Sequence, residues 1–389
     1  MTGAETCAKS SAAASQTGGA FWTIQALRFV AALAVVCVHV TFYTHERLAP
    51  SFPMYHQGAH GVRLFFVISG FVMIMSSQRL LSEPKGWAVF AVKRIFRIVP
   101  IYWLITFAKL AVVLGASNLV NHSDASDPWF VVKSLFFIPT YNADGEIKPL
   151  HAVGWTLNFE MFFYLLFTIA LAVRVPPVRF IAPILILLSI LSLWRSSDWP
   201  AVLQFLCDPI NLDFLAGMLI AGWVLRGMTI APSMAWALVA VGMVGLFAPI
   251  TWPVMPELVA SLVITLLSAA TIFGAATLES RVGAQIPPAV LFMGAASYSL
   301  YLIHPLISPA APAIFAKLGI QLPFLAALCS LLIASIGGAL CYRFVETPIS
   351  NVINRRLKGT RLMGASPHVG GPRPDENDSS TGTLASRAN

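Results

Sequence analysis

The sequence predicts an all-α integral membrane protein: a bundle of about ten transmembrane helices with both termini in the cytoplasm. Of its 389 residues 57% are apolar and only 11% are charged, whereas globular domains hold about 25% charged residues. The apolar residues form long, uninterrupted blocks, and the mean hydropathy is +0.76. Uninterrupted blocks favour helices over a barrel, because backbone groups in lipid need hydrogen-bond partners within their own segment. The composition excludes soluble enzymes, disordered chains and disulfide scaffolds.

Ten apolar blocks approach the roughly 20 residues that a helix needs to cross the hydrocarbon layer. They are residues 22–43, 61–78, 98–116, 153–173, 178–194, 206–225, 231–249, 257–277, 288–308 and 322–345. A shorter apolar block, 129–139, is typical of an interfacial or re-entrant segment. The blocks define one transmembrane domain over residues 21–350, between a disordered cytoplasmic tail at 1–20 and a basic, then disordered, cytoplasmic tail at 351–389.

Basic residues in the connections predict the orientation. With the N-terminus inside, thirteen Lys and Arg residues lie on the cytoplasmic side and five, or six with Arg63, on the other. The cytoplasmic set is Arg79, Lys85, Lys93, Arg94, Arg97, Arg174, Arg179, Arg226, Arg281, Arg355, Arg356, Lys358 and Arg361. This bias places both termini in the cytoplasm and the connection at 117–152 outside. It also explains the net charge of +8 without nucleic acid, so no nucleic-acid partner is expected.

The sequence lacks several motifs that carry common chemistries. It contains no G-x-x-x-x-G-K-[ST], G-x-S-x-G or H-E-x-x-H, the motifs of ATP-driven pumps, serine hydrolases and zinc proteases. Its five cysteines include no C-x-x-C pair, so neither a metal site nor a disulfide framework is indicated. We expect no bound metal and no permanently bound cofactor.

The first apolar block carries two ionisable residues, Arg28 and His39. Ionisable groups at membrane depth are costly and are therefore candidates for function. Their spacing of eleven residues is close to three helical turns, so both lie on one helix face about 16 Å apart. Arg28 is either a snorkelling anchor at the inner interface or a functional cation. His39 lies deeper, where it is either a satisfied interhelical hydrogen-bonder or a base that works near neutral pH.

The fourth block places Glu160 among aromatic residues, one to two turns from the outer boundary. Trp155 and Tyr164 fit either an aromatic belt at the membrane interface or a substrate site. A belt does not explain a buried carboxylate, so Glu160 is a candidate catalytic residue.

Polar residues also recur in the last two blocks. Ser297, Tyr301 and His304 follow i, i+4, i+7 spacing and share one helix face. They fit either a structural role beside Pro305 or contact with a substrate. Glu346 follows Arg343 by three residues, which permits an ion pair with a structural role.

Six segments resemble the membrane acyltransferase 3 family, and they occur in the family's order between residues 22 and 350. They are residues 25–39, 61–71, 93–103, 154–164, 296–305 and 343–348. The form of 155–164, Trp-Thr-Leu-Asn-Phe-Glu-Met-Phe-Phe-Tyr, is most similar to the branch that decorates bacterial exopolysaccharides. One departure is Arg63, where many members carry an acidic residue, so no role is carried over to that position.

The resemblance implies a multi-pass O-acyltransferase of the bacterial cytoplasmic (inner) membrane. Such an enzyme moves an acyl group, usually acetyl from cytoplasmic acetyl-CoA, to a hydroxyl of a cell-surface or exported polysaccharide, free or lipid-linked. The expected catalytic residues are His39 as general base, with Arg28 and Glu160 in support. The expected CoA-phosphate ligands are Lys93, Arg94 and Arg97, and the candidate substrate-binding residues are Trp155, Tyr164, Ser297, Tyr301 and His304. No activated Ser or Cys motif is visible, which favours direct transfer and leaves an acyl-histidine intermediate open.

Two alternatives remain open from the sequence. An acyltransferase of the same family that acts on a small molecule, such as a macrolide, differs only in its acceptor. A transporter or flippase for a lipid-linked glycan belongs to another class; inverted repeats and interrupted helices near the midplane would indicate it, and the sequence shows neither clearly.

Overall fold

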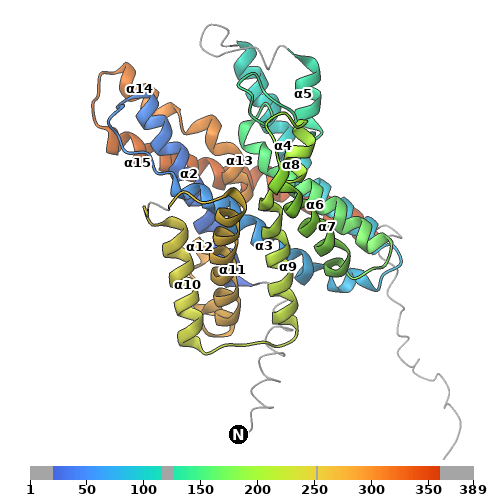
Figure 1. Cartoon of the computed structure of the whole chain (residues 1–389). Helices are drawn as coiled ribbons and strands as arrows, with labels where there is room; N and C mark the ends of the chain where they lie inside the picture. Colours follow the sequence, from blue (N-terminus) through green and yellow to red (C-terminus); the bar gives the residue numbers. More distant parts are fainter. Residues whose placement is uncertain (1–20, 116–126, 251–252, 360–389) are drawn as a thin grey trace, which may run out of the picture.

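The computed structural model describes residues 21–115, 127–250 and 253–359, and these residues form a helical bundle without named strands (Figure 1). In this part of the chain nine helical segments are long and apolar enough to cross a membrane, and a shorter helix, α10, is also apolar. The predicted class, an all-helical multi-pass membrane protein, is confirmed. The count of ten and the cytoplasmic termini stay predictions, and the tails at 1–20 and from 360 lie outside the described residues.

The described residues form fifteen α-helices. In chain order they are α2 (Trp22–Arg47), α3 (His60–Ser77), α4 (Gly86–Gly115), α5 (Pro128–Leu135), α6 (Trp155–Ala172), α7 (Pro177–Leu191), α8 (Ala201–Leu206), α9 (Leu212–Leu225), α10 (Pro232–Phe247), α11 (Glu257–Val282), α12 (Pro288–Ala295), α13 (Ser297–Ile307), α14 (Ala310–Lys317), α15 (Pro323–Cys341) and α16 (Thr347–Gly359). A π-helical stretch, Tyr342–Glu346, joins α15 to α16.

Two predicted spans differ from the structure in ways that affect the site. The third begins at Gly86 rather than near residue 98 and runs for 30 residues. Helix α4 therefore contains Lys93, Arg94 and Arg97, which do not belong to the connection before it. The ninth, expected as one span over 288–308, is instead two helices, α12 and α13, that meet at Ala296.

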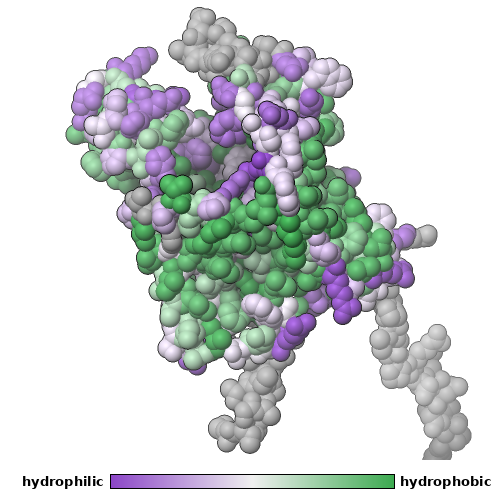
Figure 2. Space-filling model, viewed as in Figure 1, coloured by the Kyte–Doolittle hydropathy of each residue, from purple (hydrophilic) through white to green (hydrophobic). Residues whose placement is uncertain are grey.

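Helices α3 and α9 form a closely packed pair at the centre of the bundle. A Cβ atom on Gly70 of α3 would lie 2.1 Å from the carbonyl oxygen of Phe214, and one on Gly217 of α9 would lie 2.0 Å from that of Val67. Small residues at such crossings let two backbones touch, which is how helices associate without a hydrophobic driving force. Figure 2 shows an apolar belt around this region, with polar side chains gathered above and below it.

Arg63 adds a buried ion pair to the same contact. Its guanidinium donates to the carboxylate of Asp213 on α9, which is 0% exposed, and also to Ser261 and Thr265 of α11. The residue that departs from the family pattern thus finds its partner within the bundle and ties three helices together.

Candidate active site

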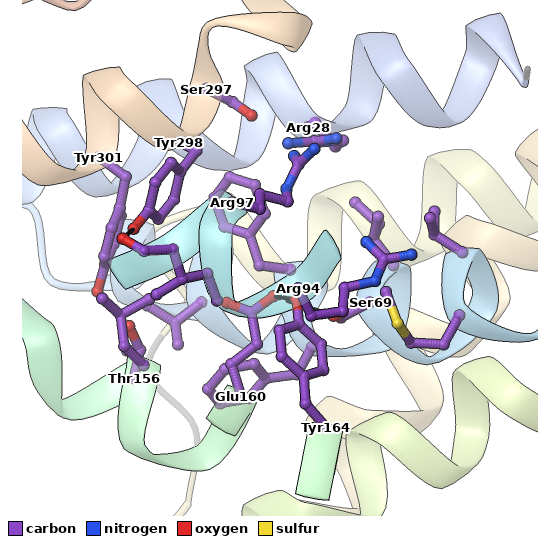
Figure 3. Close-up of a pocket in the computed structure, with 18 residues that line it drawn as sticks. Arg28, Ser69, Arg94, Arg97, Thr156, Glu160, Tyr164, Ser297, Tyr298 and Tyr301 are labelled. Atoms are coloured by element: carbon purple, nitrogen blue, oxygen red, sulfur yellow. Dashed lines mark hydrogen bonds between the residues drawn. The ribbon is translucent and has the colours of Figure 1, made fainter. Parts of the chain in front are cut away.

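Helices α2, α3, α4, α6 and α13 enclose a cavity near the middle of the chain's helical bundle (Figure 3). It is lined by Arg28, Val62, Phe65, Phe66, Ile68, Ser69, Val72, Met73, Arg94, Arg97, Ile98, Thr156, Leu157, Glu160, Tyr164, Ser297, Tyr298 and Tyr301. Its empty space, including the open mouth, is about 800 Å³.

One end of the cavity is basic. Arg28 of α2 and Arg94 and Arg97 of α4 supply three guanidinium groups, against the single carboxylate of Glu160 among the lining residues. In the described ranges no hydrogen bond or ion pair joins Arg28 or Arg97 to another residue, and their charges interact with the carboxylates of Glu346 and Glu160. Buried charges are costly unless they are paired, so this end is suited to bind an anion.

Arg94 is held in place by its neighbours. Its Nη2 atom donates to Ser76 Oγ at 2.9 Å. Its guanidinium lies 5.4 Å from the ring centroid of Phe90 and 5.8 Å from that of Tyr164, distances at which a cation is attracted to an aromatic ring. The Nε atom is buried and has no hydrogen-bond partner among the described residues.

Glu160 stands beside this basic end. Its Oε1 atom accepts hydrogen bonds from Ser69 Oγ at 3.2 Å and from the hydroxyl of Tyr164. Its negative charge also interacts with the positive charges of Arg28, Arg94 and Arg97. The carboxylate therefore faces the cations and not the His39 ring.

The opposite end of the cavity is uncharged. Thr156 and Tyr301 line it, and the Phe65 ring lies 6.2 Å from that of Tyr301; Figure 3 shows Tyr301 and Thr156 at one side of the cavity and Arg28 and Arg94 at the other. The Tyr301 hydroxyl hydrogen-bonds the carbonyl oxygen of Val153 and the hydroxyl of Thr156, both at 3.0 Å. These contacts fix the ring across the end of the cavity.

A second, wider cavity adjoins the basic end. It is lined by Ser76, Arg79, Leu80, Glu83, Val89, Phe90, Lys93, Arg94, Phe96, Arg97, Ser350, Ile353 and Asn354, from α3, α4, α16 and the turn between α3 and α4. Arg94 and Arg97 line both cavities. A ligand that spans the two spaces would therefore pass between these arginines.

His39 lies beyond the uncharged end and does not line either cavity. Its ring packs against that of His304 with 4.8 Å between the centroids, and its Nδ1 atom lies 3.2 Å from His304 Nε2. The Tyr301 ring is 5.9 Å from the His304 ring. The cavity thus ends one aromatic ring away from an imidazole pair. Across the described ranges no group of His, Cys, Asp and Glu residues is arranged to hold a metal ion.

The structure brings most of the predicted site residues together. Seven line the first cavity: Arg28, Arg94, Arg97, Glu160, Tyr164, Ser297 and Tyr301. Lys93 lines the second cavity, and His39 and His304 form the imidazole pair. Trp155 lines neither cavity and packs its ring edge-to-face against Phe159. The roles assigned to these residues stay predictions.

Sequence reasoning missed several residues at the site. Ser69 and Thr156 are uncharged and sit in apolar blocks, so no charge or spacing marked them. Tyr298 lines the cavity and donates to the carbonyl oxygen of Ile98 at 2.8 Å. Glu346 accepts from Ser299 Oγ at 2.6 Å and does not pair with Arg343, whose side chain is exposed.

A membrane-embedded helical bundle with a buried, basic cavity is the architecture found here, and residues 21–343 match the acyltransferase domain of the acyltransferase 3 family. The chain belongs to this family and is a membrane acyltransferase, as the sequence blocks predicted. Among curated proteins, it is 34% identical over 323 residues to "Exopolysaccharide production protein ExoZ" of Rhizobium meliloti (strain 1021), a match that covers 79% of this chain and 93% of that protein. No solved structure matches the chain.

Proposed function

We propose that this protein is an O-acetyltransferase of the bacterial inner membrane that transfers acetyl from cytoplasmic acetyl-CoA to a hydroxyl of an exported polysaccharide. The family supplies the reaction class, and the printed name of the relative, an exopolysaccharide production protein, supports the acceptor class. The observation that carries the proposal is the polarity of the cavity, which is basic where it meets the second cavity and uncharged where it approaches the imidazole pair.

The basic end suits the phosphates of the donor. Arginine presents a planar fork of donors that matches phosphate oxygens, and such charge-assisted hydrogen bonds are about twice as strong as neutral ones. Arg94 and Arg97, with Lys93 in the second cavity, would hold the phosphates. Arg28 would add a fourth cation near the pantetheine arm. The extended arm then points its thioester toward Tyr301.

The uncharged end suits a small neutral acyl group. Phe65, Thr156 and Tyr301 offer no cation to the free carboxylate of a succinyl group. Burying an unpaired carboxylate is expensive, so acetyl is favoured over succinyl.

His39 supplies the base for the proposed reaction. A sugar hydroxyl is a poor nucleophile until a positioned base takes its proton, a contribution of about 10²–10⁴-fold. The hydroxyl oxygen attacks the thioester carbonyl carbon while its proton moves to His39. The carbon–sulfur bond then breaks, and the departing thiolate takes the proton back from the imidazolium. Glu160, held by Tyr164 and Ser69, would orient the thioester or an acceptor hydroxyl.

The test is acetyl transfer by the purified protein in lipid nanodiscs. The donor is acetyl-CoA labelled in its acetyl group, and the acceptor is polysaccharide from cells that lack this gene. We expect free CoA thiol and alkali-labile label on the polysaccharide, little transfer from succinyl-CoA, no product with His39→Ala and a severe loss with Glu160→Ala. The matched control is His56→Ala, which changes an exposed histidine. Wild-type protein that leaves acetyl-CoA unconsumed would contradict the function, and a folded His39→Ala protein with normal transfer would contradict the base.

A further inference from the structure

His304 of α13 is the side chain that contacts the His39 ring by a hydrogen bond. Its Nε2 atom lies 3.2 Å from His39 Nδ1, and the two residues are 265 positions apart in the chain. His304 is 0% exposed. In the described part of the chain no carboxylate hydrogen-bonds either imidazole. In a catalytic triad an aspartate is the hydrogen-bond partner of the histidine. Here that partner is a second histidine.

The contacts of the two rings are satisfied by one arrangement of hydrogens. His39 Nδ1 lies 3.1 Å from the carbonyl oxygen of Val35, and His304 Nδ1 lies 3.2 Å from that of Leu300. A carbonyl oxygen only accepts, so both Nδ1 atoms carry a hydrogen. Each neutral ring then has its lone pair on Nε2. His304 Nε2 accepts from His39 Nδ1–H, which is shared with Val35 in a three-centre bond, and the lone pair of His39 Nε2 remains free.

We propose that His304 is a positioning residue for His39: it accepts the Nδ1 hydrogen, keeps Nε2 free as the base and stabilises the imidazolium that forms during transfer. This inference rests on the proposed function. When the acceptor hydroxyl gives its proton to His39 Nε2, the Nδ1–H bond to His304 becomes a charge-assisted hydrogen bond. Such bonds are stronger than neutral ones, and more so away from water. The proton returns from Nε2 to the departing CoA thiolate, so His304 itself neither gains nor loses a proton.

A purely structural role makes a different prediction. If His304 only fills space beside Tyr301 and His39, any side chain of similar volume replaces it. If it acts as an acceptor, the replacement must carry an acceptor near the Nε2 position. Gln provides a carbonyl oxygen there, and Leu provides similar volume without an acceptor. The pair His304→Gln and His304→Leu therefore separates the two roles.

The experiment measures kcat and the KM for acetyl-CoA with the purified proteins in nanodiscs and unacetylated polysaccharide as acceptor. We expect His304→Leu to lower kcat by about tenfold or more, up to the 10²–10⁴-fold that general base catalysis contributes in total, with an unchanged KM for acetyl-CoA. His304→Gln should keep most of the wild-type kcat.

Two results would overturn the inference. They are a normal kcat for His304→Leu, and equal losses for the Leu and Gln variants at equal thermal stability. A wild-type protein that transfers no acetyl would remove the proposed function, and the inference with it. If the wild-type protein transfers acetyl and the His304→Leu variant is equally active, the inference fails and the proposed function stands.

Discussion

Arg63 of α3 and Asp213 of α9 form a hydrogen-bonded ion pair in the interior of the bundle, with 12% of the Arg63 side chain and 0% of the Asp213 side chain exposed. The Thr265 hydroxyl donates to Asp213 Oδ1 at 2.7 Å, and Arg63 also donates to Ser261. Buried polar groups are almost always hydrogen-bonded in folded proteins. The pair therefore fixes the crossing of α3, α9 and α11, and the helix α3 also carries part of the cavity wall.

Removal of one partner of this pair should destabilise the protein strongly. Asp213→Leu leaves the Arg63 guanidinium buried and unpaired, a change that typically costs about 3–5 kcal/mol. The matched double variant Arg63→Met with Asp213→Leu removes both charges and should regain most of the stability. Thermal unfolding in detergent, followed by size-exclusion chromatography, measures both. Equal midpoints for wild type and Asp213→Leu would contradict the structural role.

Loss of the shared arginines should weaken donor binding. A hydrogen bond to a charged group contributes about 1.5–3 kcal/mol, so Arg94→Ala and Arg97→Ala should each raise the Kd for acetyl-CoA by about tenfold or more. The control is Arg226→Ala, which removes an exposed arginine in a connection predicted to be cytoplasmic. Calorimetry on purified protein gives the affinities. Unchanged donor affinity in a correctly inserted Arg94→Ala/Arg97→Ala protein would leave only a role in membrane topology.

His151 should make the stability of the fold depend on pH. The ring is 2% exposed and hydrogen-bonds the carbonyl oxygen of Leu302 at 2.9 Å, and burial lowers its pKa from 6.5 to about 4. Between these values the unfolded chain binds a proton that the folded chain does not. Stability from this group is complete above pH 6.5 and falls as the pH drops toward 4, by up to about 3 kcal/mol.

The matched variant for that measurement is His151→Gln. Its amide keeps a donor for Leu302 but does not titrate, so thermal unfolding between pH 7 and pH 4 should lose this part of its pH dependence. Parallel pH curves for wild type and His151→Gln would rule out His151 as the source.

The predicted orientation can be tested with reporter fusions. The charge bias places the 117–152 connection outside and both termini in the cytoplasm. Alkaline phosphatase fused at Ala143 should be active, and a fluorescent protein fused near Gly370, which lies beyond the described residues, should fold in the cytoplasm. A cytoplasmic signal from the Ala143 fusion would invert the orientation and place the basic end of the cavity on the wrong side for cytoplasmic acetyl-CoA.

The sequence predicted most of the bundle because lipid imposes a simple rule: apolar length gives a span. It also placed Arg28 and His39 on one helix about three turns apart, because this follows from helical spacing alone. The sequence prediction failed where an apolar block contains a break between two helices, or where a helix extends beyond its apolar block. The apolar block at 288–308 does not show that α12 ends at Ala295, and the basic residues before residue 98 do not look like part of a membrane helix although α4 contains them.

The contacts between distant helices could not be predicted from one sequence. The partner of His39 is His304, and nothing in either local pattern specifies which faces of α2 and α13 meet. Glu160 was expected near His39 or the acceptor, but only the packing of α3, α4 and α6 shows that it faces Ser69 and Tyr164. Those contacts depend on tertiary packing rather than on periodicity.

The polarity of the cavity affects the free-energy cost of moving an acyl group across the membrane. A charge at the centre of a bilayer costs about 2.5–3.5 kcal/mol even on the most lenient scale, and a CoA molecule carries several. Under the proposed function, Arg94 and Arg97 at the junction of the two cavities would hold the phosphates where they enter, and only a neutral acyl group would move on toward Tyr301 at the far end. The energetic barrier to crossing the membrane would then concern a few uncharged atoms, so the transfer would need neither an ion gradient nor ATP.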